Sequence, residues 1–194
     1  MARTRAFDPD VALGKVVDLF AARGYAETSM EDIVQATGVS RYGLYGTFGN
    51  KRELFEKALD TFAERMGKRS FLRLLDEDAS MASIRRIFTE RIDEMCCKDA
   101  ERGCLFIHTS MELAPGNEDI RDVLQKFMGR MAKTFSIGLG NAQRNGDVRA
   151  DLDVRAAGDL LTSTMFGLAV LARAGFRRDA LEAIVDQTLA SMAA

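Results

Sequence analysis

The scarcity of helix-breaking residues is the feature that most constrains how this chain can fold. Only two of its 194 residues are proline, Pro9 and Pro115, and single glycines punctuate long stretches of helix-favouring residues. No segment alternates apolar and polar residues for long, as a half-exposed strand would. We therefore predict an all-helical protein with about nine helices, by the spacing of its apolar residues.

Capping and stop signals divide the chain into these helices. Asp8 before Pro9 begins the first helix and Gly24 ends it, while Thr28-Ser29-Met30-Glu31 has the pattern of a capping box for a short second helix. A third, very short helix follows over residues 41–45. The remaining predicted helices cover 51–75, 81–95, 104–114, 117–146, 154–174 and 181–192.

Composition and charge narrow the functional class. The formal net charge is −2 at pH 7, and 47% hydrophobic with 29% charged residues is typical of a soluble globular protein. No stretch approaches the roughly 20 continuous apolar residues of a membrane span, and the N-terminus lacks the apolar core of a signal peptide. We expect a cytoplasmic protein with no membrane partner, in which Cys96, Cys97 and Cys104 are reduced. Their spacing, together with the single histidine, matches no zinc site, so no metal is expected. No cofactor is expected either.

Residues 28–52 have the layout of a helix-turn-helix. Gly38 permits a tight turn between two short helices, and no acidic residue interrupts the run that holds Arg41, Lys51 and Arg52. Residues 1–55 carry seven basic and seven acidic residues, so a positive surface must be local. The predicted small core against the first helix consists of Met30, Ile33, Val34, Val39, Leu44 and Phe48.

The outward residues of this segment have the chemistry for reading DNA. Arg41 can donate two hydrogen bonds to guanine, tyrosines can contact thymine methyl groups or phosphates, and Gly43 lets the backbone come close to DNA. Hydroxyl groups and free amides at helix N-termini hold phosphate. The predicted DNA contacts are Thr28, Ser29, Ser40, Arg41, Tyr42, Gly43, Tyr45, Thr47 and Lys51.

Two stretches carry a resemblance to a known family. The segment GVSRYGLYGTFGNKRELF, residues 38–55, closely resembles the signature of the TetR/AcrR family of bacterial transcriptional regulators, and LFAARGYAETSMEDI, residues 19–33, is similar to the same family. The chain departs from the commoner pattern at Gly46-Thr47, where a bulky residue followed by histidine is frequent. Gly43 and Gly46 each weaken the short helix by about 0.5–1 kcal/mol relative to alanine.

The resemblance implies a two-domain homodimer without an enzymatic step. A helix-turn-helix DNA-binding domain would occupy residues 1–50, and a ligand-binding and dimerisation domain residues 51–194, with 51–75 as the linking helix. Residues 154–193 would pair across the dimer axis, and the partner would be a palindromic double-stranded DNA operator. A small apolar effector would release the repressor by changing the spacing of the two recognition helices.

The candidate effector contacts are mostly apolar residues of the second domain. Methionine suits a pocket that adapts to varied apolar ligands, although residues at helical spacing are more often core. His108 follows Cys104 by four residues and shares its helical face. The candidates are Phe88, Ile92, Met95, Cys104, Phe106, His108, Met111, Met128, Phe135, Met165 and Phe166.

Three alternatives stay open at this point. Cys104 follows Gly103 at a predicted helix N-terminus, which favours thiolate chemistry, and RGCLF resembles family members that sense oxidants or electrophiles. A catalyst using Cys104 and His108 would need an oxyanion or cofactor motif, which the sequence does not offer. A dimerisation adaptor without DNA binding would have no need for the exposed bases Arg41 and Lys51.

Overall fold

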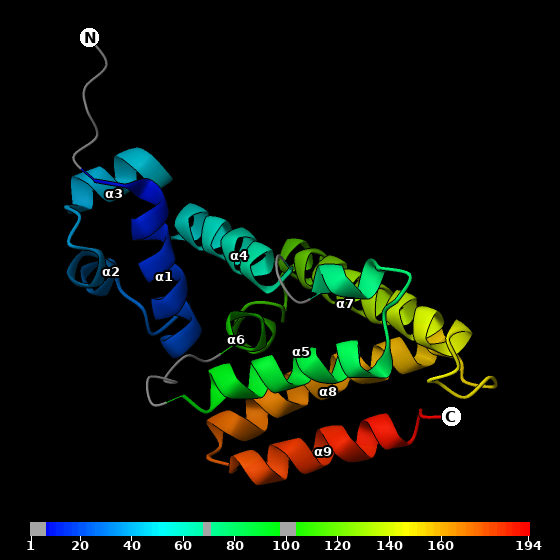
Figure 1. Ribbon diagram of the computed structural model, residues 1–194. Coiled ribbons are helices and arrows are strands. Elements are labelled where there is room, and N and C mark those ends of the chain that lie inside the picture. The colour runs from blue at the N-terminus through cyan, green and yellow to red at the C-terminus, as the bar shows by residue number, and fades with distance from the viewer. Residues whose placement is uncertain (1–6, 68–70, 98–103) are drawn as a thin grey trace. The chain divides into compact units, whose positions relative to one another are not determined.

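The protein is almost entirely helical. The computed structural model describes residues 7–67, 71–97 and 104–194, and the ribbon of these ranges is built of helices (Figure 1). In them are nine α-helices, one 3-10 helix and a single isolated bridge between Val148 and Ala193. The all-helical prediction is confirmed. The helices are α1 Pro9–Arg23, α2 Met30–Thr37, α3 Arg41–Phe48, α4 Lys51–Gly67, η1 Phe71–Leu75, α5 Met81–Met95, α6 Leu105–Glu112, α7 Glu118–Arg144, α8 Val154–Arg173 and α9 Arg178–Ala190.

Helix α4 ends earlier than the sequence predicted. The linking helix was expected over 51–75, but the α-helix stops at Gly67, and residues 71–75 form the 3-10 helix η1. Glycine commonly marks a helix end because it adopts conformations that other residues avoid. Phe71 and Leu74 are buried, and the Phe71 ring packs edge-on against Phe135 at 5.1 Å between centroids. Burial of these apolar side chains therefore fixes η1.

The chain forms two compact units that alternate along the sequence. The first contains Met1–Arg65 together with Arg102–Ile120, and the second contains Met66–Glu101 together with Arg121–Ala194. Packing thus places α6 with the helix-turn-helix, whereas the sequence suggested domains of 1–50 and 51–194. The division at residue 50 follows from the DNA-binding and ligand-binding roles that the family resemblance implies, and it remains a proposal.

An aromatic cluster forms the core of the first unit. The Phe20 and Phe55 rings meet edge-on at 5.0 Å, and Tyr25 packs against Phe55 at 4.9 Å. Phe20, Phe55 and Leu54 are essentially inaccessible to solvent. These ring contacts hold α1 and α4 together. Helix α2 packs against α1, and α3 packs against α2.

Close helix packing holds the second unit together. A Cβ at Gly158 of α8 would lie 2.6 Å from the Ala132 carbonyl oxygen of α7, so this approach requires glycine. The Asn141 side-chain amide donates to the carbonyl of Asp76 at 2.6 Å, which ties α7 to the segment after η1. In the core, the Phe88 and Phe135 rings stack at 5.7 Å.

Helix α8 exposes an apolar stripe. Ala156, Leu160, Ser163, Gly167 and Val170 follow helical spacing and are all exposed, with Leu160 at 49% and Val170 at 50%. Within the described residues, α8 alone is long and apolar enough to cross a membrane, although core helices of soluble proteins pass the same test. Stripes of this kind on soluble proteins mark interaction surfaces.

Candidate nucleic-acid interface

Helix α3 divides cleanly into a buried and an exposed face. Leu44 and Phe48 are buried against the rest of the first unit. Arg41, Tyr42 and Tyr45 point outward, and Tyr42 is 84% exposed. Large aromatic side chains that are exposed on a short helix contribute nothing to the core. They are available to a partner.

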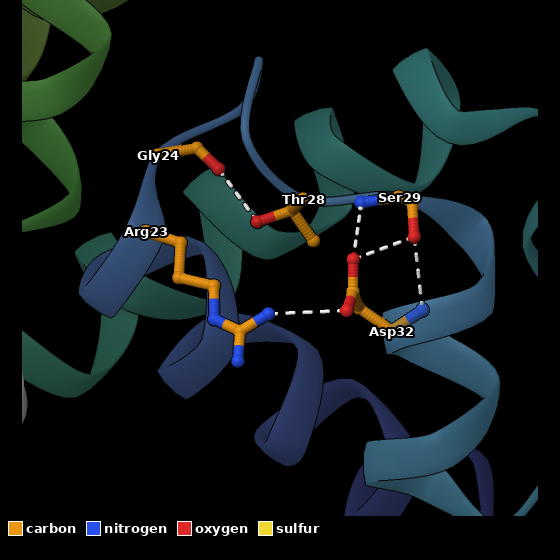
Figure 2. Close-up of polar contacts among 5 residues, drawn as sticks. All are labelled: Arg23, Gly24, Thr28, Ser29 and Asp32. Carbon is orange, nitrogen blue, oxygen red and sulfur yellow. Dashed lines mark hydrogen bonds and ion pairs between the residues drawn. The ribbon is translucent and has the colours of Figure 1, made fainter.

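The α2 N-terminus is built by a capping box one residue later than predicted. The Ser29 hydroxyl accepts from the Asp32 backbone N–H at 3.1 Å, and Asp32 accepts from the Ser29 backbone N–H at 2.8 Å (Figure 2). Hydrogen bonds from Ser29 and the nearby Arg23 guanidinium lower the pKa of the Asp32 carboxyl, even though desolvation opposes the shift. The same hydrogen bonds hold this cap in place.

Thr28 has a structural role that sequence reasoning did not foresee. Its side chain is buried, and its hydroxyl donates to the Gly24 carbonyl oxygen at 2.7 Å (Figure 2). The prediction that Thr28 contacts DNA phosphate is therefore corrected, because a buried hydroxyl that already donates to a carbonyl cannot reach DNA phosphate. Thr28 closes the loop between α1 and α2 instead.

The two glycines of α3 differ in their surroundings. A Cβ at Gly43 would lie 3.1 Å from Val39 and 3.4 Å from Phe7, so Gly43 faces the protein rather than an open surface. Gly46 is exposed, and a Cβ there would have nothing within 4 Å. The backbone approach to DNA that was predicted for Gly43 therefore fits Gly46 better.

Ser40 and Thr47 complete the predicted contacts of this helix. Ser40 is exposed and caps α3, since its hydroxyl accepts from the Gly43 backbone N–H at 3.2 Å. Thr47 is half-buried. Ser29 and Ser40 thus mark two helix N-termini on the first unit, where free amide groups favour anions.

No acidic residue lies between Arg41 and Arg52 in the sequence, but acidic side chains lie beside these bases in the folded protein. The Arg41 guanidinium lies 2.6 Å from a Glu31 carboxylate oxygen, and Arg52 pairs with Glu56 at 2.8 Å. The Lys51 ammonium sits 4.2 Å from the centre of the Tyr25 ring. Glu31 was missed because the pair joins residues on different helices, which no spacing rule within one helix detects.

We expect Gly46→Ala to stabilise the fold while weakening operator binding. The methyl group meets no protein atom within 4 Å, and alanine favours a helix by about 1 kcal/mol over glycine. If DNA occupies that space, affinity should fall about tenfold, the scale of one mismatched base pair. Thermal unfolding and fluorescence anisotropy with operator DNA measure the two effects.

Gly129→Ala is the matched control, because Gly129 is also an exposed helical glycine with open space at its Cβ. It should stabilise the fold and leave DNA binding unchanged. Unchanged affinity in Gly46→Ala would exclude close DNA approach at Gly46.

The predicted pocket residues fall into both compact units. Cys104, Phe106, His108 and Met111 lie in the first, and Phe106 packs against Phe62 at 5.4 Å. The second unit holds the other candidates, of which Phe88, Ile92, Phe135 and Met165 are buried, Met95, Met128 and Phe166 half-buried. The stacked Phe88 and Phe135 rings pack as core residues do. Helical spacing by itself also favours a core role over a pocket role.

Two of the candidate effector contacts, Met111 and Met95, do not line a closed apolar pocket. Met111 is 75% exposed, because the buried face of α6 carries Leu105, Phe106 and Thr109. It is therefore corrected to a surface residue. Met95 borders an open hollow of about 630 Å³ in the second unit, beside Cys96, Phe176 and Arg178. Among the described residues, no three His, Cys, Asp or Glu side chains are grouped so as to hold a metal ion.

Two family models match the chain. The model for "Bacterial regulatory proteins, tetR family" covers residues 16–58, and that for "Tetracyclin repressor-like, C-terminal domain" covers residues 80–188. The HTH-type transcriptional repressor ComR of Escherichia coli is 31% identical over 96% of this chain and 90% of its own length. The HTH-type transcriptional regulator TtgR of Pseudomonas putida is 27% identical over 77% of this chain and 72% of its own.

A solved DNA complex has the same fold. A cysteine mutant of the TetR family transcriptional regulator CifR, with a 26-bp double-strand operator, superimposes with a TM-score of 0.84 at 29% identity, covering 97% of this chain and 99% of its own. These comparisons favour ligand-responsive regulation over the cysteine-sensing alternative. The exposed α3 face, the cap that orients it and the matches along the chain agree: this protein belongs to the TetR family of bacterial regulatory proteins, and it is a helix-turn-helix DNA-binding transcriptional regulator.

Proposed function

We propose that the protein is a dimeric repressor that leaves its operator when a small apolar molecule binds the residues beyond the helix-turn-helix. The observation that carries this proposal is the outward face of α3, where Arg41, Tyr42 and Tyr45 are exposed on a helix anchored by Leu44 and Phe48. A helix presented in this way can enter the major groove of DNA. Arg41 would read guanine, and the tyrosines would contact thymine methyl groups or phosphates.

The apolar stripe of α8 supports a homodimer through residues 154–193. Ala156, Ser163 and Gly167 are small residues that allow two helices to approach closely, and Leu160 with Val170 supplies apolar area. The exposed side of α9 is more polar, since Glu182 and Asp186 form ion pairs with Arg178 and Arg85. Helix α8 is therefore the centre of the proposed interface, and a two-fold axis there would match a palindromic operator.

Effector binding would act by shifting a population of conformations. A ligand can move the equilibrium only by its preference for the dimer geometry whose recognition helices no longer match both half-sites. The half-buried Met128 and Phe166 of the second unit remain proposed contacts for an apolar effector. No chemical step, metal or cofactor enters this mechanism, and its place is the cytoplasm, where the operator DNA is.

Selection of binding sites from random duplex DNA tests the proposal. The purified protein should recover a palindrome whose half-sites lie about one helical turn apart. Recovery of no enriched sequence would contradict sequence-specific binding and favour the adaptor interpretation. The recovered operator then serves as the probe for apolar compounds that release it.

We expect Lys51→Ala to weaken binding to all sequences by a similar factor. Lys51 begins α4, and its ammonium is held over the Tyr25 ring, a position suited to a phosphate rather than to a base edge. The slope of log affinity against log salt should fall by about one per half-site. Anisotropy titrations on operator and random DNA at several salt concentrations measure it, and a change in base preference would contradict a phosphate contact.

A further inference from the structure

A carboxylate from α6 organises the loop between α1 and α2. Glu112, the last residue of α6, accepts hydrogen bonds through one oxygen from the backbone N–H groups of Tyr25 at 2.8 Å and Ala26 at 3.2 Å. All three residues belong to the first compact unit. Backbone amides that donate to a carboxylate form charge-assisted hydrogen bonds, which are stronger than neutral ones.

The loop is shaped to receive this carboxylate. Gly24 ends α1 with φ 85°, and a Cβ at this position would overlap the second carboxylate oxygen of Glu112. That oxygen lies 3.5 Å from His108 Nδ1, one turn earlier on α6. The absence of a side chain at Gly24 and the two amides of the next residues thus form a cradle for one carboxylate.

The same loop supports a predicted DNA contact. The Tyr25 ring packs on Phe55 and lies under the Lys51 ammonium, 4.2 Å from it. Glu112 fixes the backbone of Tyr25, and the ring of Tyr25 in turn holds Lys51. A continuous set of contacts therefore leads from α6 to the start of α4.

We propose that Glu112 is a positioning residue for operator binding, which acts on Lys51 through Tyr25. Helix α6 lies within residues 80–188, which match the C-terminal family domain, yet it packs with the helix-turn-helix. It also carries the candidate effector contacts Phe106 and His108. This inference rests on the proposed function.

Three substitutions at Glu112 separate reach from charge. Glu112→Asp keeps the charge but withdraws the carboxylate by one methylene, whereas Glu112→Gln loses the charge but keeps an oxygen that can accept both amides. We expect Glu112→Asp and Glu112→Ala to lower operator affinity about 3- to 30-fold, the range for residues that modulate coupling. Glu112→Gln should stay within about twofold of the wild type by the same scale.

The sign of the effect separates positioning from simple electrostatics. Removal of an acidic residue ordinarily strengthens DNA binding, because it reduces repulsion of phosphate. Glu27→Ala is the matched control, since Glu27 is an exposed acid of the same loop; its affinity should rise or stay constant. An increase in Glu112→Ala as well, or weakening in Glu112→Gln but not in Glu112→Asp, would overturn the proposal.

Two further readouts locate the effect. Hydrogen exchange should quicken at the amides of Tyr25 and Ala26 in Glu112→Ala and Glu112→Asp, with or without DNA. Glu112→Ala combined with Lys51→Ala should bind no more weakly than Lys51→Ala alone, whereas independent residues would give multiplied losses. Multiplied losses, or unchanged exchange, contradict the inference alone. A wild-type protein that binds no operator contradicts the proposed function, while the exchange measurement still tests the loop contact.

Discussion

Replacement of Arg41 by alanine is expected to lower affinity for each operator half-site by about 1–3 kcal/mol and to relax specificity at a single base pair. Arg41 is exposed at the start of α3, and its guanidinium is bound only on one side by Glu31 in the described structure. Such a group can turn to guanine O6 and N7, because an exposed ion pair of this kind is worth about 0–1 kcal/mol. Site selection with the variant protein measures the lost preference.

Glu31→Gln tests the same pair from its other side. The substitution frees Arg41 for any phosphate, so binding to random DNA should strengthen while operator binding changes little, and the ratio of specific to random affinity should fall. For Arg41→Ala the matched control is Arg86→Ala, because Arg86 forms a comparable exposed pair with Glu90 in the second unit. Uniform weakening on all sequences in Arg41→Ala would assign Arg41 to phosphate instead of a base.

Gly167→Arg is expected to produce a folded monomer with severely reduced operator binding. A Cβ at Gly167 meets nothing within 4 Å, so the protomer accepts the side chain, and arginine favours a helix by about 0.8 kcal/mol over glycine. Across a two-fold axis, however, a long charged side chain keeps the α8 stripes apart. Loss of the second half-site should cost about 10²–10⁴-fold in affinity.

Light scattering and operator titration check both effects of Gly167→Arg. Gly129→Arg introduces the same residue at another exposed helical glycine with open space, on α7. It should stay dimeric and bind as the wild type does. A dimer in Gly167→Arg with full operator affinity would place the interface elsewhere.

The sequence alone determined the helical class and the helix-turn-helix. Local signals suffice for both: Asp8 with Pro9 begins α1, and Gly24 ends it in a conformation with positive φ, as expected. The spacing of Leu44 and Phe48 likewise identified the buried side of α3. These signals are short-range, since a cap or a helical face involves residues within about four positions of each other.

Tertiary structure decided the features that depend on residues far apart in the chain. Sequence reasoning assigned close approach to Gly43, but Val39 and Phe7 lie beside Gly43, whereas a Cβ at Gly46 would have nothing within 4 Å. Glu112 had no local signal, because its partners lie 86 and 87 residues away. The burial of Thr28 is likewise a property of the folded protein that its capping pattern does not indicate. Local chemistry fixes where a helix begins and which side it buries, whereas the partner of each polar group depends on which helices pack together.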